Sequence, residues 1–273
     1  MTRSPRPPGK PLPRGRTFRP RSPGERQPDA LWIYGFHPAL AVLQNPQRTI
    51  KRIIATPNAL ARVKEAGATL AVAAEETTPR LLDHLLGGEA VHQGIAIEVA
   101  PLPPVAIETL PASARLVVVL DQVTDPHNVG AIIRSAVAFG ADALVTTGRH
   151  APVETGVLAK AASGALELLA HVEVQNLARA LEALGEAGFT RIGLDSEAAN
   201  ALDVAMTGER IALVLGAEGK GLRRLTRDTC DRLARLPTIG PITSLNVSNA
   251  AVLGLYIARR HLGAGRAVGA FHE

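Results

Sequence analysis

Short apolar runs alternate with amphipathic stretches over most of the chain, a pattern typical of a sheet whose strands are joined by helices. Between Arg115 and Arg260 the apolar runs are continuous, as expected for parallel strands covered by helices on both faces. The expected strands are Leu116–Leu120, Ala143–Thr147, His171–Val174, Arg191–Leu194 and Ile211–Leu215. The expected helices are Asn128–Phe139, Thr155–Leu169, Leu177–Gly188 and Val247–Arg260. We therefore predict an α/β fold with a mostly parallel sheet.

A smaller α/β unit precedes this sheet. It opens with Leu31–Tyr34 and has β-branched strands at Ile50–Ala55 and Gly94–Val99, with helices at His37–Leu43, Ala59–Ala66 and Thr78–Leu86. Prolines then crowd the stretch from Pro101 to Pro111, which is typical of a linker. The predicted organisation is a tail at 1–29, a small domain at 30–100, a linker at 101–112 and a larger domain at 113–273.

The net charge of the chain, +5, is located entirely in the tail. Residues 1–29 contain eight Arg or Lys, two acidic residues and eight prolines, which gives them a charge of +6. The other 244 residues hold 22 basic and 23 acidic groups, which gives −1. Such a tail buries too little apolar surface to offset its chain entropy, so we expect it to be disordered and to bind a polyanion.

Composition also excludes several classes of protein. Cys230 is the only cysteine, and the histidines lack ligand spacing, so we expect neither disulfides nor a metal site. No apolar segment follows the basic stretch before Leu31, so a secretory signal is not expected. The uncharged run Leu236–Ala258 contains two Pro, two Thr, two Ser and two Asn, and we interpret it as a loop plus a core helix rather than a membrane span. A cytoplasmic protein without membrane contact is the expectation.

The first strand of the larger domain ends in a polar segment, Asp121–Gly130, that leads into a helix. This segment lacks the G-x-G-x-x-G turn of dinucleotide sites, and Gly216–Gly221 lacks the spacing and the final hydroxyl of a phosphate loop. Both absences argue against a dinucleotide oxidoreductase and a nucleotide triphosphatase. On the helix, Arg134 has no carboxylate three or four residues away, so it is either a ligand for a phosphate or hydroxyl, or a solvated surface residue. Asn128 either caps the helix or belongs to a site.

Two later segments also combine small, polar and apolar residues. Three glycines within Gly216–Gly221 permit a close backbone approach to a ligand, and Glu218 among them either grips that ligand or is an exposed loop carboxylate. The stretch Leu236–Asn249 runs directly into a helix. Its Ser and Asn residues either cap that helix or contribute polar groups to a site.

Together and in this order, the three segments resemble the signature motifs of the SpoU branch of the SPOUT RNA ribose 2′-O-methyltransferases. The matching segments are Asp121–Ser135, Leu215–Leu222 and Leu236–Ser248. In addition, Tyr34–His37 and Val91–Gly94 are similar to the small substrate-binding domain, of ribosomal-protein L30e type, that precedes the catalytic domain in 23S rRNA guanosine 2′-O-methyltransferases. The departures are Leu236 and Thr238, where Ile and Met are commoner, and Thr147-Gly148, where the family usually has Pro-Lys.

The resemblance implies a fold that periodicity does not reveal, an α/β sheet whose C-terminal segment forms a trefoil knot. It also implies a homodimer and an S-adenosylmethionine cofactor. The residues implied to hold the cofactor are Gly216, Leu236, Leu245, Leu215, Ala217 and Ile239. Those implied to surround the methyl-transfer point are Arg134, Asn128, Glu218, Ser244 and Asn246.

The implied reaction is methylation of a ribose 2′-hydroxyl, with a guanosine of 23S rRNA as the expected substrate. A tRNA guanosine is the alternative substrate, and a catalytically silent RNA-binding protein is the alternative of another class. Because a guanidinium is a poor proton acceptor, we expect Arg134 to stabilise the developing alkoxide by its charge and to clamp a neighbouring phosphate. The proton would then leave to phosphate, to Glu218 or to water.

Overall fold

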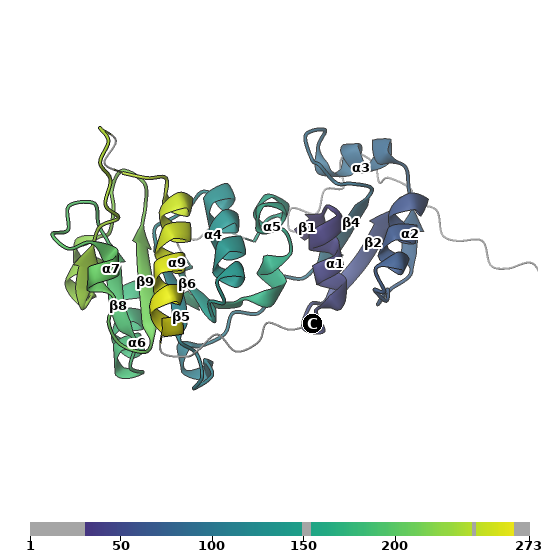
Figure 1. Ribbon diagram of the computed structural model, residues 1–273. Helices are drawn as coiled ribbons and strands as arrows, with labels where there is room; N and C mark the ends of the chain where they lie inside the picture. The colour runs from purple at the N-terminus through teal and green to yellow at the C-terminus, as the bar shows by residue number, and fades with distance from the viewer. Residues whose placement is uncertain (1–30, 149–153, 242–243, 265–273) are drawn as a thin grey trace, which may run out of the picture.

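The computed structural model describes residues 31–148, 154–241 and 244–264, and it contains two sheets (Figure 1). A four-stranded sheet lies in the N-terminal part of the chain, and a six-stranded sheet lies in the C-terminal part. The tail predicted at 1–29 lies outside the described residues, as do Arg149 and His150. The predicted α/β fold class is confirmed.

The small sheet has the order β1-β4-β2-β3, in which β4 pairs antiparallel with both β1 and β2. Helices α1 and α2 cover one face and α3 covers the other. The three helices are α1 (Phe36–Gln44), α2 (Pro57–Glu65) and α3 (Pro79–Leu86). The strands are β1 (Leu31–Tyr34), β2 (Ile50–Ala55), β3 (Ala74–Glu76) and β4 (Ile95–Val99). The short strand β3 was not predicted, because two of its three residues are glutamates.

Every strand pair in the larger sheet is parallel, and the order is β10-β8-β9-β5-β6-β7. Its strands are β5 (Leu116–Asp121), β6 (Ala143–Thr147), β7 (Ala170–Val174), β8 (Thr190–Leu194), β9 (Ile211–Gly216) and β10 (Arg232–Ala234). The apolar runs of the sequence predicted the first five, whereas β10 is too short and polar to have a recognisable pattern. The trefoil knot stays a prediction.

Helices cover both faces of the larger sheet, as continuous apolar strands require. On one face lie α4 (Pro126–Ala138), α5 (Gly156–Ala162), the short α7 (Leu202–Ala205) and α9 (Val247–Ala264). On the other face lie α6 (Leu177–Glu186) and α8 (Arg224–Thr229). Alternate residues of β5 point to the two faces: Val118 belongs to the core under α4, and Val119 to the core under α6.

The helix predicted over Thr155–Leu169 is wrong as a single element. It divides into α5 and a short 3₁₀ helix, η2 (Ala165–Leu168), because Ser163 and Gly164 both adopt left-handed backbone conformations, with φ of 52° and 92°. Gly164 makes this break possible, since a side chain there would come within 2.9 Å of Ala41 in the small domain. Apolar periodicity carries no signal for such a break.

Hydrogen bonds and apolar packing attach the predicted linker to the larger domain at several points. The backbone N–H of Leu102 donates to Glu154 at 3.1 Å, and that of Val105 donates to the carbonyl of His171 at 2.9 Å. A single 3₁₀ turn, η1 (Ile107–Thr109), lies within it, and Ile107 packs against the core under α6.

Candidate active site

Helix α4 begins at the carboxyl end of the central strand β5, where a parallel sheet places its ligands. Asp125 caps this helix, because its carboxylate accepts the N–H of His127 at 3.0 Å. The possibility that Asn128 is the cap is therefore wrong. Its side chain instead reaches across to the glycine loop after β9, where Nδ2 donates to Oε1 of Glu218 at 3.3 Å.

Asn246, from the third motif, joins the same cluster and also caps a helix. Its Oδ1 accepts from the N–H of Ser248 at 2.9 Å at the start of α9. Its Nδ2 donates to Oδ1 of Asn128 at 3.1 Å and to Oε1 of Glu218 at 2.5 Å. Because both ends of the carboxamide are engaged, its orientation is fixed. Of the two alternatives left open by the sequence, capping is confirmed for this residue, and its place in a functional site stays a prediction that these contacts support.

Glu218 is the point where the three motifs meet. Its Oε1 accepts from Asn128, from Asn246 and, at 3.3 Å, from the backbone N–H of Val247. Its second oxygen, Oε2, has no hydrogen-bond partner within the described part of the chain. The cluster therefore presents one oriented, uncommitted carboxylate oxygen at an exposed position.

A cavity of about 300 Å³ adjoins this cluster at the carboxyl ends of β8 and β9. Of the residues expected to hold the cofactor, Leu215, Gly216, Ala217, Leu236 and Leu245 all line it, and so do Glu218 and Ser244. Ile239 does not line it and is fully exposed. Its assignment to the cofactor stays a prediction that this placement does not support.

The glycine loop closes on itself, which explains its composition. The N–H of Gly221 donates to the carbonyl of Ala217 at 2.9 Å, and Gly219 and Gly221 have φ of 74° and 63°. A side chain on Gly216 would overlap the backbone of Gly221. Gly216 is thus required by the loop itself, and the loop in turn forms one wall of the cavity.

Arg134 lies apart from the cluster. It is exposed on α4, six residues beyond Asn128, which corresponds to about 9 Å along the helix axis and a different helix face. Its side chain forms no hydrogen bond or ion pair with any residue that the structure describes. The structure therefore brings Asn128, Glu218 and Asn246 together but not Arg134.

Some residues at this edge were not predicted. Asp195 and Ser196 line the cavity from the end of β8, and Asp195 forms an ion pair with Arg227. Their position directly after an apolar strand is the sequence signal that could have identified them. Asp121, the first residue of the first motif, is fully buried and accepts from the Arg223 side chain at 2.6 Å and its backbone N–H at 2.9 Å. This pair ties the glycine loop to the end of β5.

The lining of the cavity fits a nucleoside cofactor. Its apolar walls, Leu194, Leu215, Leu236 and Val247, suit the face of a base, and Ser196, Thr238 and Ser244 supply polar groups for a ribose. Within the described residues no group of His, Cys, Asp or Glu is arranged to hold a metal ion. In the same part of the chain, none of the helices has the length and apolar character needed to cross a membrane.

Two family models match the chain. The SpoU rRNA methylase family matches residues 115–256, and the family of RNA 2′-O ribose methyltransferase substrate-binding domains matches residues 32–105. These ranges correspond to the six-stranded and four-stranded sheets.

Similar proteins cover almost the whole chain. A 23S rRNA (guanosine-2′-O-)-methyltransferase RlmB of Pseudomonas putida is 39% identical over 242 residues, which is 84% of this chain and 95% of the relative. The RlmB of Vibrio cholerae is 37% identical over 86% of this chain and 98% of its own length.

Among solved structures, the SpoU methyltransferase AviRb of Streptomyces viridochromogenes in complex with AdoMet superposes with a TM-score of 0.74 at 25% identity, covering 87% of this chain and 92% of that one. An AdoMet-bound rRNA methyltransferase of Sinorhizobium meliloti shares the fold, with a TM-score of 0.72 at 20% identity over 85% and 88% of the two chains. Since one family model spans the catalytic sheet and the relatives match nearly end to end, the chain belongs to the SpoU family of RNA 2′-O-methyltransferases.

Proposed function

We propose that this protein transfers a methyl group from S-adenosylmethionine to the 2′-hydroxyl of a guanosine in 23S rRNA. The observation that carries the proposal is the convergence of three motifs on Glu218 beside a cavity fit for a nucleoside. The relatives named for this activity support the choice of RNA.

The residues that would hold the cofactor are those that line the cavity. Leu215, Gly216 and Ala217 would contribute backbone contacts, and Leu236 and Leu245 would contribute apolar walls. When bound, S-adenosylmethionine supplies an electrophilic methyl group. The chain itself must orient the ribose, exclude water and dispose of one proton.

Glu218 is suited to hold the ribose hydroxyl and to receive its proton. Three hydrogen bonds fix its Oε1, which leaves Oε2 free to accept from the hydroxyl. Asn128 and Asn246 are then positioning residues for this carboxylate, and Ser244 offers a hydroxyl at the cavity wall. Arg134 would contribute a fixed positive charge that stabilises the developing alkoxide or clamps a phosphate.

A homodimer would bring a second chain against the helix that carries Arg134. One face of α9 packs on the sheet, whereas Val252, Leu253 and Tyr256 form a stripe on its opposite face that is 37–46% exposed. Helix α4, which carries Arg134, lies beside α9 (Figure 1). A contiguous apolar stripe of this kind is typical of an interface. Sedimentation equilibrium tests the dimer, and a monomeric chain would contradict it.

Methylation of purified RNA tests the proposed substrate. The chain is incubated with methyl-labelled S-adenosylmethionine and either 23S rRNA or total tRNA, and the modified nucleotide is mapped. A single 2′-O-methylguanosine in 23S rRNA is the expected result. Label found only in tRNA would contradict the proposed RNA but keep the reaction, and failure to bind the cofactor in equilibrium dialysis would favour a silent RNA-binding protein.

The proposal also assigns a role to each domain and segment predicted from the sequence. Residues 30–100 would select the RNA, 101–112 would link the domains, and 113–273 would carry out the chemistry in the cytoplasm. The basic tail at 1–29 would add contacts to phosphates, because its charge of +6 is the chain's main electrostatic attraction for RNA.

A further inference from the structure

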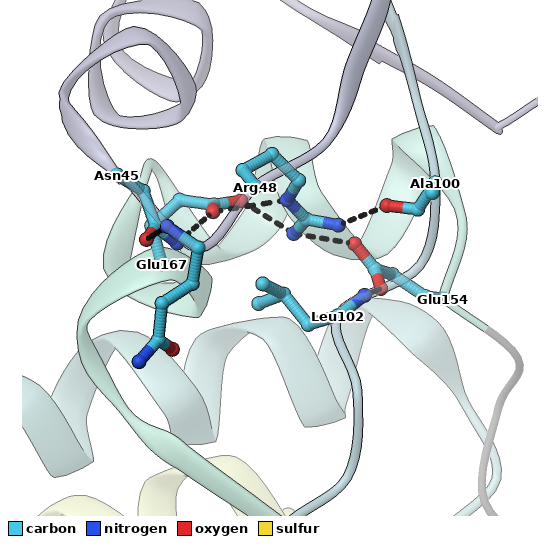
Figure 2. Close-up of polar contacts among 7 residues, drawn as sticks. Asn45, Arg48, Ala100, Leu102, Glu154 and Glu167 are labelled. Carbon is cyan, nitrogen blue, oxygen red and sulfur yellow. Dashed lines mark hydrogen bonds and ion pairs between the residues drawn. The ribbon is translucent and has the colours of Figure 1, made fainter.

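A buried arginine lies between the two domains. Arg48 follows α1 in the small domain, and its side chain has no exposed surface. Figure 2 shows its guanidinium surrounded by groups from both domains and the linker. Nε and Nη2 donate to the two carboxylate oxygens of Glu167, at 3.0 and 2.6 Å, and Nη1 donates to the carbonyl of Ala100 at 2.9 Å.

Two glutamates of the larger domain hold this arginine. Glu167, in η2, is 2% exposed and also accepts from Asn45 at 2.7 Å. Glu154, just before α5, forms an ion pair with Nη2 of Arg48 at 2.7 Å and also accepts from the N–H of Leu102. Burial alone would lower the pKa of Arg48, but these carboxylates outweigh burial and raise it. The bidentate geometry restricts both the distance and the angle between the domains.

A second polar contact involves the motifs of the small domain. The side-chain oxygen of Gln93 accepts from the N–H of Phe36 at 2.9 Å and from Nζ of Lys160, on α5, at 3.2 Å. Gly35 leaves room for this lysine, since a side chain there would overlap its Nζ. Residues of the Tyr34–His37 and Val91–Gly94 motifs thus serve to dock the small domain on α5.

Backbone contacts complete the interface. A side chain on Gly156, the first residue of α5, would lie 2.5 Å from the carbonyl oxygen of Trp32 in β1. Apolar residues of both domains form one continuous core across the boundary, in which Ile33 and Leu158 are both buried. Domains joined by a linker usually move relative to each other unless their interface is extensive and apolar. This interface combines a shared core with a buried ion pair.

Helix α5, on which the small domain docks, is in direct contact with α4. A side chain on Gly130, in the first half of α4, would lie 2.5 Å from Cβ of Ala161 and 2.7 Å from the carbonyl of Leu158. Helix α5 therefore packs backbone to backbone on the helix that carries Asn128. The contacts run without a gap from the small domain through α5 to the cluster around Glu218.

From this chain of contacts we propose that Arg48 is a positioning residue, which locks the small domain to the catalytic domain as one rigid body and thereby fixes which ribose of the bound RNA reaches Glu218. The inference rests on the proposed function for its RNA and on the interface for its rigidity. The two parts have separate tests.

Spin labels test the rigidity without activity. In a Cys230→Ala background, labels are attached through Glu65→Cys on α2 and Glu186→Cys on α6, both exposed positions, and labelled chains are diluted with unlabelled ones. The distance distribution between the labels is expected to be narrow in the parent chain and to broaden with Arg48→Met. The control is Arg179→Met, an exposed arginine on α6, which is expected to leave the distribution narrow. A broad distribution in the parent chain would overturn the proposal.

Methylation kinetics test the positioning role. With Arg48→Met, kcat/KM for RNA is expected to fall about 100-fold, mainly through KM, because the two domains no longer bind one RNA in fixed register. Methylation is also expected to spread to neighbouring riboses, while the affinity for S-adenosylmethionine stays unchanged. Loss of cofactor affinity together with kcat would indicate general damage and would count against a positioning role.

A second variant covers the case in which Arg48→Met does not fold. Lys160→Met removes the contact with Gln93 without leaving a buried charge, and it is expected to give the same broadening and spread of methylation to a smaller degree. The proposal is overturned if a folded variant, Arg48→Met or Lys160→Met, keeps a narrow distribution of spin-label distances and still methylates a single ribose. An inactive parent chain would instead contradict the proposed function, and the spin-label distances would still decide the rigidity.

Discussion

Glu218 uses only one of its two carboxylate oxygens within the described chain, and this asymmetry distinguishes it from the other acidic residues near the cavity. Asp195 is committed to Arg227, and Asp121 accepts from Arg223 through both oxygens. The sequence left open whether Glu218 binds a ligand or is an exposed loop carboxylate without a function. The hydrogen bonds from Asn128 and Asn246 orient its carboxylate, which supports the proposed role of Glu218 in a site.

The variant Glu218→Gln tests the role of this charge. Glutamine keeps an oxygen for the bonds from Asn128 and Asn246 but is far less able to accept a proton, so single-turnover methylation is expected to slow by about 100-fold or more. Affinity for S-adenosylmethionine is expected to remain. The matched control is Glu182→Gln, on the exposed side of α6. Methylation at the parent rate would show that Glu218 neither holds nor receives the proton.

The only cysteine gives a second prediction for a single residue. Burial raises the pKa of the Cys230 thiol to about 12, and the thiol donates to the carbonyl of Thr226 at 3.2 Å. Because the thiolate is the reactive form, iodoacetamide at pH 8 is expected to leave Cys230 unmodified in the folded protein. Intact-mass spectrometry measures this, and the same treatment in denaturant is the positive control. Rapid modification of the folded chain would contradict the burial.

Among the helices, α4 and α5 approach each other closely at Gly130. Gly130 allows this approach on one side, and the small residues Ala161 and Ala162 allow it on the other. The apolar stripe of α4 was evident from the sequence, but the need for glycine at 130 was not. That need arises only because a second helix backbone lies against it.

The variant Gly130→Ala is therefore expected to destabilise the protein. The added methyl would lie 2.5 Å from Cβ of Ala161 and 2.7 Å from a backbone oxygen. Overpacking costs about 1–3 kcal/mol, which exceeds the gain of about 1 kcal/mol that alanine brings to a helix interior. Urea unfolding measures the net loss. Gly88→Ala, where nothing lies near the added methyl, is the control, and an equal stability of both variants would contradict the close packing.

For the whole molecule, the boundary between the domains couples stability to pH through His171. Burial lowers the pKa of this histidine, despite Glu173 and Glu154 nearby, and its Nε2 lies 2.8 Å from the Thr146 hydroxyl. His171 also lines a small cavity of about 40 Å³ together with Glu154 and Leu158. The unfolded chain therefore binds a proton at a higher pH than the folded chain does.

The free energy of unfolding is accordingly expected to decrease as the pH falls below about 6.5, the ordinary pKa of histidine, because protonation then favours the unfolded chain. The decrease from this one group cannot exceed about 1.4 kcal/mol per pH unit. His171→Asn is expected to reduce the slope between pH 7 and 5, as measured by urea unfolding. His84→Asn, an exposed position on α3, is expected to keep it, and identical slopes for both variants would contradict the prediction.

The sequence by itself determined the α/β class, the central strands and the three motifs. These features depend on local periodicity and on residue types within short segments. Both can be read from the sequence without the tertiary structure. The resemblance carried by these motifs named Asn128, Glu218 and Asn246 as site residues. The local sequence left open whether Asn128 caps α4, because Asn and Asp are both good caps and lie three residues apart, and the structure gives the cap to Asp125.

Only the tertiary structure decided which groups meet across long separations. Arg48 and Glu167 are 119 residues apart, and neither has a local pattern that marks it, since a buried ion pair depends on the packing of two separate sheets. The break at Ser163–Gly164 has the same origin, because it places η2 against α1. Ile239 and Arg134 lie outside the cluster for a related reason: a motif specifies residue types along the chain, whereas the direction of each side chain depends on what the fold packs against it.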